Sequence, residues 1–102
     1  MMSLTNNTSG VLDMIRGGAM LVDVRSAEEF QTGSAPGAVN IPLNEIPANL
    51  AKFEGKDAIV VFCRSGNRSG QAQLFLKQNG IANVVNGGTW IDVAQLVQQA
   101  GN

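Results

Sequence analysis

The sequence predicts an α/β protein of three layers, in which helices flank a central, mainly parallel sheet. Apolar segments typical of strands alternate with segments whose apolar residues recur at helical spacing, as in parallel sheets joined by helical crossovers. The run AIVVF at Ala58–Phe62 is continuously apolar, which indicates a central strand buried on both faces. The 102 residues suit one domain, 1–102, with flexible ends at about 1–8 and 100–102.

The first half of the chain predicts two short helices and two strands. Thr8 or Ser9 is expected to cap a helix that runs to Arg16, and Ala19–Val24 is the first strand. Ser26 and Glu29 are spaced as a capping box for a second helix, which Gly33 would end. The segments that follow are a turn at Pro36-Gly37, a brief strand at 39–41, and a loop at 42–53 with a helical part near Ile46, Leu50 and Phe53.

The second half predicts two further helices around one short strand. After the strand at Ala58–Phe62, helical spacing begins at Ser69 and stops at Asn79-Gly80. Val84-Val85 is a short strand, and Asn86–Gly88 is expected to be a turn before a helix. Thr89 is expected to cap the last helix, whose core face carries Trp90, Val93, Ala94 and Val97.

Composition excludes several classes of function. Seven basic and eight acidic residues give a net charge of -1, so neither nucleic acid nor a membrane is an expected partner. The absence of histidine removes Cys-His and Ser-His-Asp catalysis, and no metal or cofactor is expected. The start MMSLTNNTSG lacks the pattern of a signal peptide, and a lone cysteine suits a reducing compartment. A cytoplasmic protein is therefore expected, although an export signal already removed would be compatible with this sequence.

The segment between the buried strand and the helix at Ser69 is the candidate site. Its backbone amides can converge on the Cys63 sulfur, and the helix start and two arginines add positive potential that favours thiolate over thiol. Gly66 permits a backbone geometry that a Cβ would obstruct. The predicted site comprises Cys63 as nucleophile and the loop residues Arg64, Ser65, Gly66, Asn67, Arg68 and Ser69.

Two simpler interpretations stand beside this one. Cys63 could be a small buried hydrophobe, as many unpaired intracellular cysteines are; two arginines and a glycine within five residues argue against it. Arg68 could pair with Asp23 or with a glutamate instead of facing a ligand, and the ligand role is preferred. Asp23 itself, at a strand end, could accept hydrogen bonds from loop amides.

Five segments, in their order and spacing, resemble the single-domain rhodanese (thiosulfate sulfurtransferase) family. Each segment alone is a weak signal, but together they span nearly the whole chain. They are LVDVR (21–25), Glu29-Phe30, GSAPGAVNIP (33–42), IVVFCRSGNRS (59–69), and Asn86-Gly87-Gly88 with Trp90.

The resemblance implies the rhodanese fold with a five-stranded sheet, and Cys63 as the nucleophile at the base of the six-residue loop 63–68. It implies that Arg64 and Arg68 attract an anionic donor, and that Asp23 and Arg25 support the loop and the helix after it. The sequence departs from the family at Ser34, where a histidine is common before the Pro-Gly-Ala turn. We interpret this as a change in local support rather than in chemistry.

The implied reaction moves sulfane sulfur from thiosulfate, or a similar small anionic donor, to a thiol or protein-thiol acceptor through a Cys63 persulfide, with cyanide as the assay acceptor. A monomer or weak homodimer is expected. One alternative is a persulfide carrier or binding module that a partner protein loads. A phosphatase or arsenate reductase is disfavoured. The loop of those related families has the pattern C-x5-R, whereas four residues separate Cys63 from Arg68 in this sequence.

Overall fold

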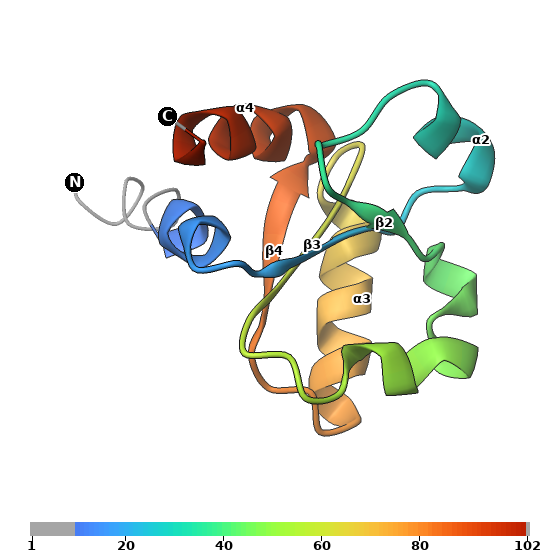
Figure 1. Ribbon diagram of the computed structural model, residues 1–102. Helices are drawn as coiled ribbons and strands as arrows, with labels where there is room; N and C mark the ends of the chain where they lie inside the picture. The colour runs from blue at the N-terminus through green and yellow to red at the C-terminus, as the bar shows by residue number, and fades with distance from the viewer. Residues whose placement is uncertain (1–9, 102) are drawn as a thin grey trace.

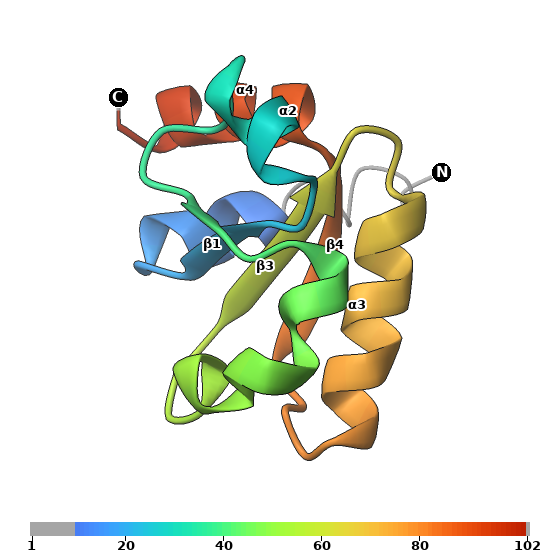
Figure 2. The same ribbon diagram turned by 90° about the vertical axis from the view of Figure 1, so that its right-hand side faces the viewer.

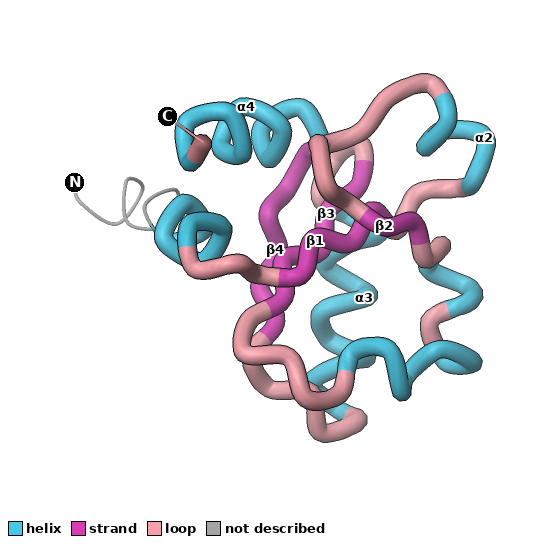
Figure 3. The backbone as a smooth tube through the Cα atoms, in the orientation of Figure 1, coloured by secondary structure: helices cyan, strands magenta, loops and turns pink. Residues whose placement is uncertain are grey.

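The computed structural model describes residues 10–101. The four strands β1 (Met20–Asp23), β2 (Val39–Asn40), β3 (Ile59–Cys63) and β4 (Val84–Thr89) form one sheet (Figure 3). Their order in the sheet is β2-β1-β3-β4. Every neighbouring pair is parallel, so the carboxyl ends of the strands share one edge. The predicted α/β class and parallel sheet are confirmed.

Helices cover both faces of this sheet (Figure 1). A helix at residues 10–16 and α4 (Trp90–Ala100) pack on one face; α3 (Asn67–Gln78) and the 3₁₀ helices η1 (Leu43–Glu45) and η2 (Pro47–Phe53) pack on the other. Alternate side chains of β3 enter the two cores: Val60 and Phe62 face α4, and Ile59, Val61 and Cys63 face α3. Cys63 therefore belongs to the core under α3.

Local sequence signals for helix starts are confirmed. Ser26 and Glu29 form both bonds of the capping box at the start of α2 (Ala27–Gln31). Thr89 caps α4 by accepting a hydrogen bond from the Asp92 amide. The caps proposed at Thr8 or Ser9 and the flexible end at 1–8 lie outside the described residues.

The number of strands and two boundaries differ from expectation. The sheet has four strands within residues 10–101 rather than five. The fifth came from the family resemblance alone, and the segment 42–53 that separates β2 from the next strand forms 3₁₀ turns. The helix expected from Ser69 begins two residues earlier, at Asn67, because Gly66 at φ 93° serves as its N-cap.

The predicted turn at Asn86–Gly88 is wrong, because β4 continues through it to Thr89. A bulge accommodates the glycines: Val61 pairs with Asn86, and Phe62 pairs with Gly88. A Cβ on Gly87 would come within 2.8 Å of the Val60 and Val93 side chains. The absence of a side chain at Gly87 thus allows β4 to lie close to β3 and α4. The bulge changes the register of β4 directly after Asn86.

No helix among residues 10–101 has the length and apolar character required to cross a membrane.

Candidate active site

Cys63 is the last residue of β3, at the carboxyl edge of the sheet. From there the chain arches over the amino-terminal end of α3 (Figure 2). Arg64, Ser65 and Asn67 are exposed on this arch, whereas Gly66 is half-buried and Ser69 is buried in the first turn of α3. The predicted loop thus occupies the edge where parallel α/β folds bind ligands.

Three groups of the loop contact the Cys63 sulfur. The Gly66 amide donates to Sγ at 3.0 Å, and the Ser69 amide donates to it at 3.4 Å. The Ser69 hydroxyl lies 3.3 Å from Sγ, where either atom can be the donor. The predicted convergence of amides on the sulfur is therefore present in the structure.

These contacts favour the thiolate against the effect of burial. Burial raises the pKa of the Cys63 thiol, whereas the hydrogen bonds of the Ser69 hydroxyl and amide and of the Ser65 and Gly66 amides lower it. Together the hydrogen bonds outweigh the effect of burial, so the pKa of the Cys63 thiol lies below its ordinary value. Backbone amides and the Ser69 hydroxyl thus lower the pKa of the thiol, an effect that the sequence analysis assigned partly to arginines.

Cys63 is buried beneath the loop. Cys63 is 0 % exposed, so a donor in solvent has no direct path to Sγ in this conformation. Gly66 and Ser69 are the loop residues that contact Sγ, whereas Arg64 and Ser65 are exposed. Gly66, at φ 93°, gives the loop the backbone conformation that places its amide against Sγ.

Arg68 forms an ion pair with a glutamate, the alternative left open above. Its guanidinium donates to both carboxylate oxygens of Glu29, at 2.7 and 3.0 Å. Glu29 also completes the capping box with Ser26, so one carboxylate ties α2 to α3. Arg64 is exposed and makes no ion pair among residues 10–101. Of the two loop arginines, Arg64 is the one whose charge is not already neutralised.

The Glu29 pair predicts an acid-sensitive contribution to stability. The Arg68 guanidinium, and next the Ser26 amide, lower the pKa of Glu29 from 4.5 to about 2. A carboxyl whose pKa is lower in the folded state adds stability above pH 4.5, and loses it as the pH falls to about 2. Glu29→Gln should lower stability by about 1 kcal/mol at neutral pH, because both side chains are partly exposed, and this difference should vanish in acid.

Melting temperatures measured across this pH range check that prediction. Glu28→Gln is the matched control, because Glu28 is exposed, adjacent, and unpaired among the described residues. Its acid response should match that of the unmodified protein. An acid response of Glu29→Gln identical to that of the unmodified protein would contradict the prediction.

Asp23 and Arg25 form a buried ion pair at the end of β1. The Arg25 guanidinium donates to Asp23 from Nε at 3.0 Å and from Nη2 at 2.7 Å, and also donates to the Gly33 carbonyl. Its charge lies 4.9 Å from the centre of the Trp90 ring. The partners of Asp23 are Arg25 and Ser34, not the amides of the loop 63–69. The pair thus braces the segment after α2.

Ser34, the departure from the family pattern, provides that local support. Its hydroxyl donates to Asp23 Oδ2 at 2.7 Å. Sequence reasoning did not foresee this bond, nor the place of Asn86, whose side chain contacts both Gly66 and Ser69 of the loop. The only signal at Asn86 was a neighbouring glycine pair, which predicts a turn.

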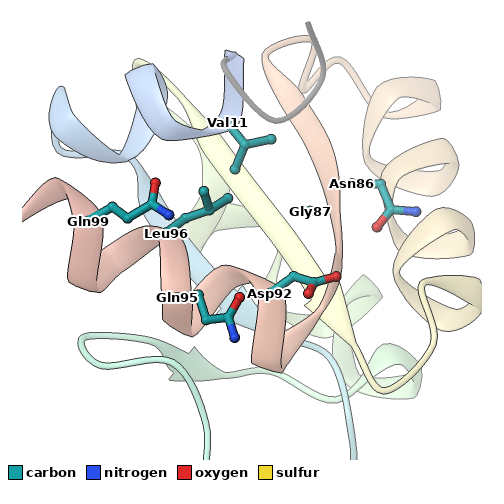
Figure 4. Close-up of a pocket in the computed structure, with 7 residues that line it drawn as sticks. All are labelled: Val11, Asn86, Gly87, Asp92, Gln95, Leu96 and Gln99. Carbon is teal, nitrogen blue, oxygen red and sulfur yellow. The ribbon is translucent and has the colours of Figure 1, made fainter. Parts of the chain in front are cut away.

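Two cavities lie near these elements. One, of about 340 Å³, is bounded by the helix at 10–16, β4 and α4 (Figure 4). Another, of about 530 Å³, is lined by residues of α2 and η1 together with Arg68. Of the two, the second touches the loop, so it offers space beside the site at the carboxyl edge.

Comparison with known proteins agrees with this geometry. Thiosulfate sulfurtransferase PspE of Escherichia coli is 37% identical over 75 residues, which are 72% of each chain. A sulfurtransferase of Allochromatium vinosum is 37% identical over 67 residues, 66% of this chain and 63% of the relative.

Solved structures give the same result. A structure described as rhodanese with anions from E. coli has a TM-score of 0.69 and 35% identity, covering 76% of this chain and 93% of that one. The human single-domain sulfurtransferase TSTD1 has a TM-score of 0.72 and 29% identity, covering 85% and 91%. The family model for the rhodanese-like domain matches residues 8–89. With a buried cysteine under converging amides at the end of a central parallel strand, the chain belongs to the rhodanese-like domain family.

Proposed function

We propose that this protein is a thiosulfate sulfurtransferase that carries sulfur as a persulfide on Cys63. The observation that carries the proposal is the cluster of donors on Sγ, the Gly66 and Ser69 amides at 3.0 and 3.4 Å. Such donors stabilise a sulfur anion, whether thiolate or the terminal sulfur of a persulfide. The sulfurtransferase relatives from E. coli and A. vinosum support the assignment.

The reaction is a double displacement. The Cys63 thiolate attacks the sulfane sulfur of thiosulfate; a new S–S bond forms, the donor's S–S bond breaks, and sulfite leaves with the electron pair. A nucleophilic acceptor, a thiol or protein thiol in the cell and cyanide in an assay, then attacks the outer sulfur and releases the thiolate. No proton has to be removed from an ionised thiol, which agrees with a chain without histidine.

Arg64 is the group proposed to draw the anionic donor to the loop, because its guanidinium is exposed and unpaired within residues 10–101. Arg68 adds a weaker field, because Glu29 neutralises it. The anions in the E. coli rhodanese structure support a small anionic donor. We place the reaction in the cytoplasm, where a lone cysteine stays reduced.

Intact-mass analysis tests the proposal. Incubation with thiosulfate should add one sulfur atom to the protein, and cyanide should remove it. The Cys63→Ser variant is the matched control, since it keeps the loop but lacks the nucleophile, and it should gain no mass. An unchanged mass in the unmodified protein would contradict the thiosulfate reaction.

The same preparation separates the rival functions. A persulfide carrier would not turn over thiosulfate but would gain one sulfur atom from a cysteine desulfurase supplied with cysteine. A phosphatase would hydrolyse a phosphate ester, which we do not expect, because the loop is one residue shorter than C-x5-R.

A further inference from the structure

Asn86 connects β4 to the loop that surrounds Cys63. In Figure 4 its side chain points from β4 toward α3, away from the other labelled residues. Its Nδ2 donates to the Gly66 carbonyl at 2.9 Å. Its Oδ1 accepts hydrogen bonds from the Ser69 hydroxyl at 2.7 Å and from the Gly88 amide at 2.9 Å. One side chain thus contacts Gly66 and Ser69, two of the residues whose amides face the sulfur.

The orientation of this amide is fixed by its partners. The Gly88 N–H can only donate, so it must face Oδ1, and the Gly66 carbonyl can only accept, so it must face Nδ2. A flipped amide would lose both bonds. The Oδ1 atom of Asn86 is therefore directed at the Ser69 hydroxyl. The oxygen of that hydroxyl lies 3.3 Å from the Cys63 sulfur.

The Ser69 hydroxyl has one proton and two possible acceptors. When Cys63 is a thiol, its S–H can donate to Ser69 Oγ, and Ser69 donates to Asn86 Oδ1. When Cys63 is a thiolate, the hydroxyl can turn toward Sγ, and Oδ1 keeps the Gly88 amide. Cys63 and Ser69 are both 0 % exposed, so water cannot replace either partner. The chain of bonds satisfies both protonation states.

We propose that Asn86 is a positioning residue for Cys63: it holds Gly66 and Ser69 against the sulfur, and takes the Ser69 hydroxyl bond whenever the sulfur is protonated. The role depends on the proposed function only in that Cys63 is the nucleophile. Asn86 touches neither the sulfur nor a substrate, and it acts through Ser69 and Gly66.

Asn86→Asp tests this role with little change of shape. The carboxylate cannot donate to the Gly66 carbonyl, it binds the Ser69 proton more tightly, and it brings a negative charge near the sulfur. All three changes oppose the thiolate. We expect the pH midpoint of Cys63 ionisation to rise by about one pH unit or more.

The other charges around the sulfur remain in place in this variant. Arg68 of α3 is the cation that interacts with Cys63, and Glu29 of α2 neutralises it. Asp23, at the end of β1, is held by Arg25. Arg64 lies on the exposed arch. None of these groups makes a hydrogen bond to Asn86, so the change in midpoint can be assigned to position 86.

Thiolate absorbance in the ultraviolet measures the midpoint directly. The chain has one cysteine and no tyrosine, so Cys63→Ser supplies a clean blank. Asn83→Asp is the matched control: Asn83 is exposed, and its Nδ2 donates to the Lys56 carbonyl, so this variant has the same change in charge and loses the same kind of bond. Its midpoint should equal that of the unmodified protein.

A second measurement needs no variant. In the unmodified protein, the NMR signals of the Asn86 side-chain amide should titrate with the midpoint of Cys63, and those of Asn83 should not. A folded Asn86→Asp protein with an unchanged midpoint, or a flat Asn86 titration, would overturn the proposal. Both readouts follow ionisation and not sulfur transfer, so they can fail or succeed independently of the thiosulfate reaction.

Discussion

Asp23→Asn is expected to lower the free energy of unfolding by about 3–5 kcal/mol, because it leaves a buried guanidinium without its counter-charge. Asp23 is 0 % and Arg25 is 3 % exposed. Asp23 accepts four hydrogen bonds from Arg25 and one from Ser34. The asparagine NH₂ would present a donor to these donors, and water cannot reach the site to compensate.

Urea unfolding followed by the fluorescence of Trp90, the chain's single tryptophan, measures this loss. Asp57→Asn is the matched control, because Asp57 is exposed and makes no ion pair among the described residues. It removes the same charge and should change stability by about 0.5 kcal/mol or less. Equal losses in the free energy of unfolding would show that the buried pair contributes no more to stability than an exposed carboxylate does.

The parts of the fold that the sequence predicts well are governed by neighbouring residues. The capping box at Ser26 and Glu29 and the cap at Thr89 depend on chemistry within one helical turn. The buried strand Ile59–Cys63 follows from its continuous apolar run. The path of β4 through Gly87 depends instead on contact with Val60 and Val93, which no local pattern contains.

The same division holds for the site. The loop around Cys63 is contiguous, so its inward amides were predictable from a cysteine between a strand and a helix. Glu29 binds Arg68 across 39 residues of sequence. Asn86 binds Ser69 across 17 residues. Such long-range partners leave no mark in spacing, which is why the sequence left the role of Arg68 open between ligand and ion pair.

Gly66→Ala is expected to slow sulfur uptake by Cys63 about a hundredfold, the usual scale for losing one donor of an anion-stabilising site. Gly66 has φ 93°, which alanine rarely adopts, although the nearest atom to the new Cβ, Gly88 Cα, would lie at an ordinary 3.5 Å. The strain, and not a collision, should therefore move the backbone. The amide that moves is the one 3.0 Å from Sγ, so the pKa of the thiol should rise as well.

Gly80→Ala separates strain from site chemistry. Gly80 follows α3, has φ 88°, and has open space around its Cβ position, so both variants should lose about 1–2 kcal/mol of stability. Single-turnover mass analysis with thiosulfate, at a temperature where both are folded, should show a slow reaction in Gly66→Ala alone. A normal rate in Gly66→Ala would mean that the Gly66 amide does not stabilise the reacting sulfur. A slow rate in both variants would mean that strain at either end of α3 displaces the loop amides. The slow reaction could then not be assigned to the Gly66 amide.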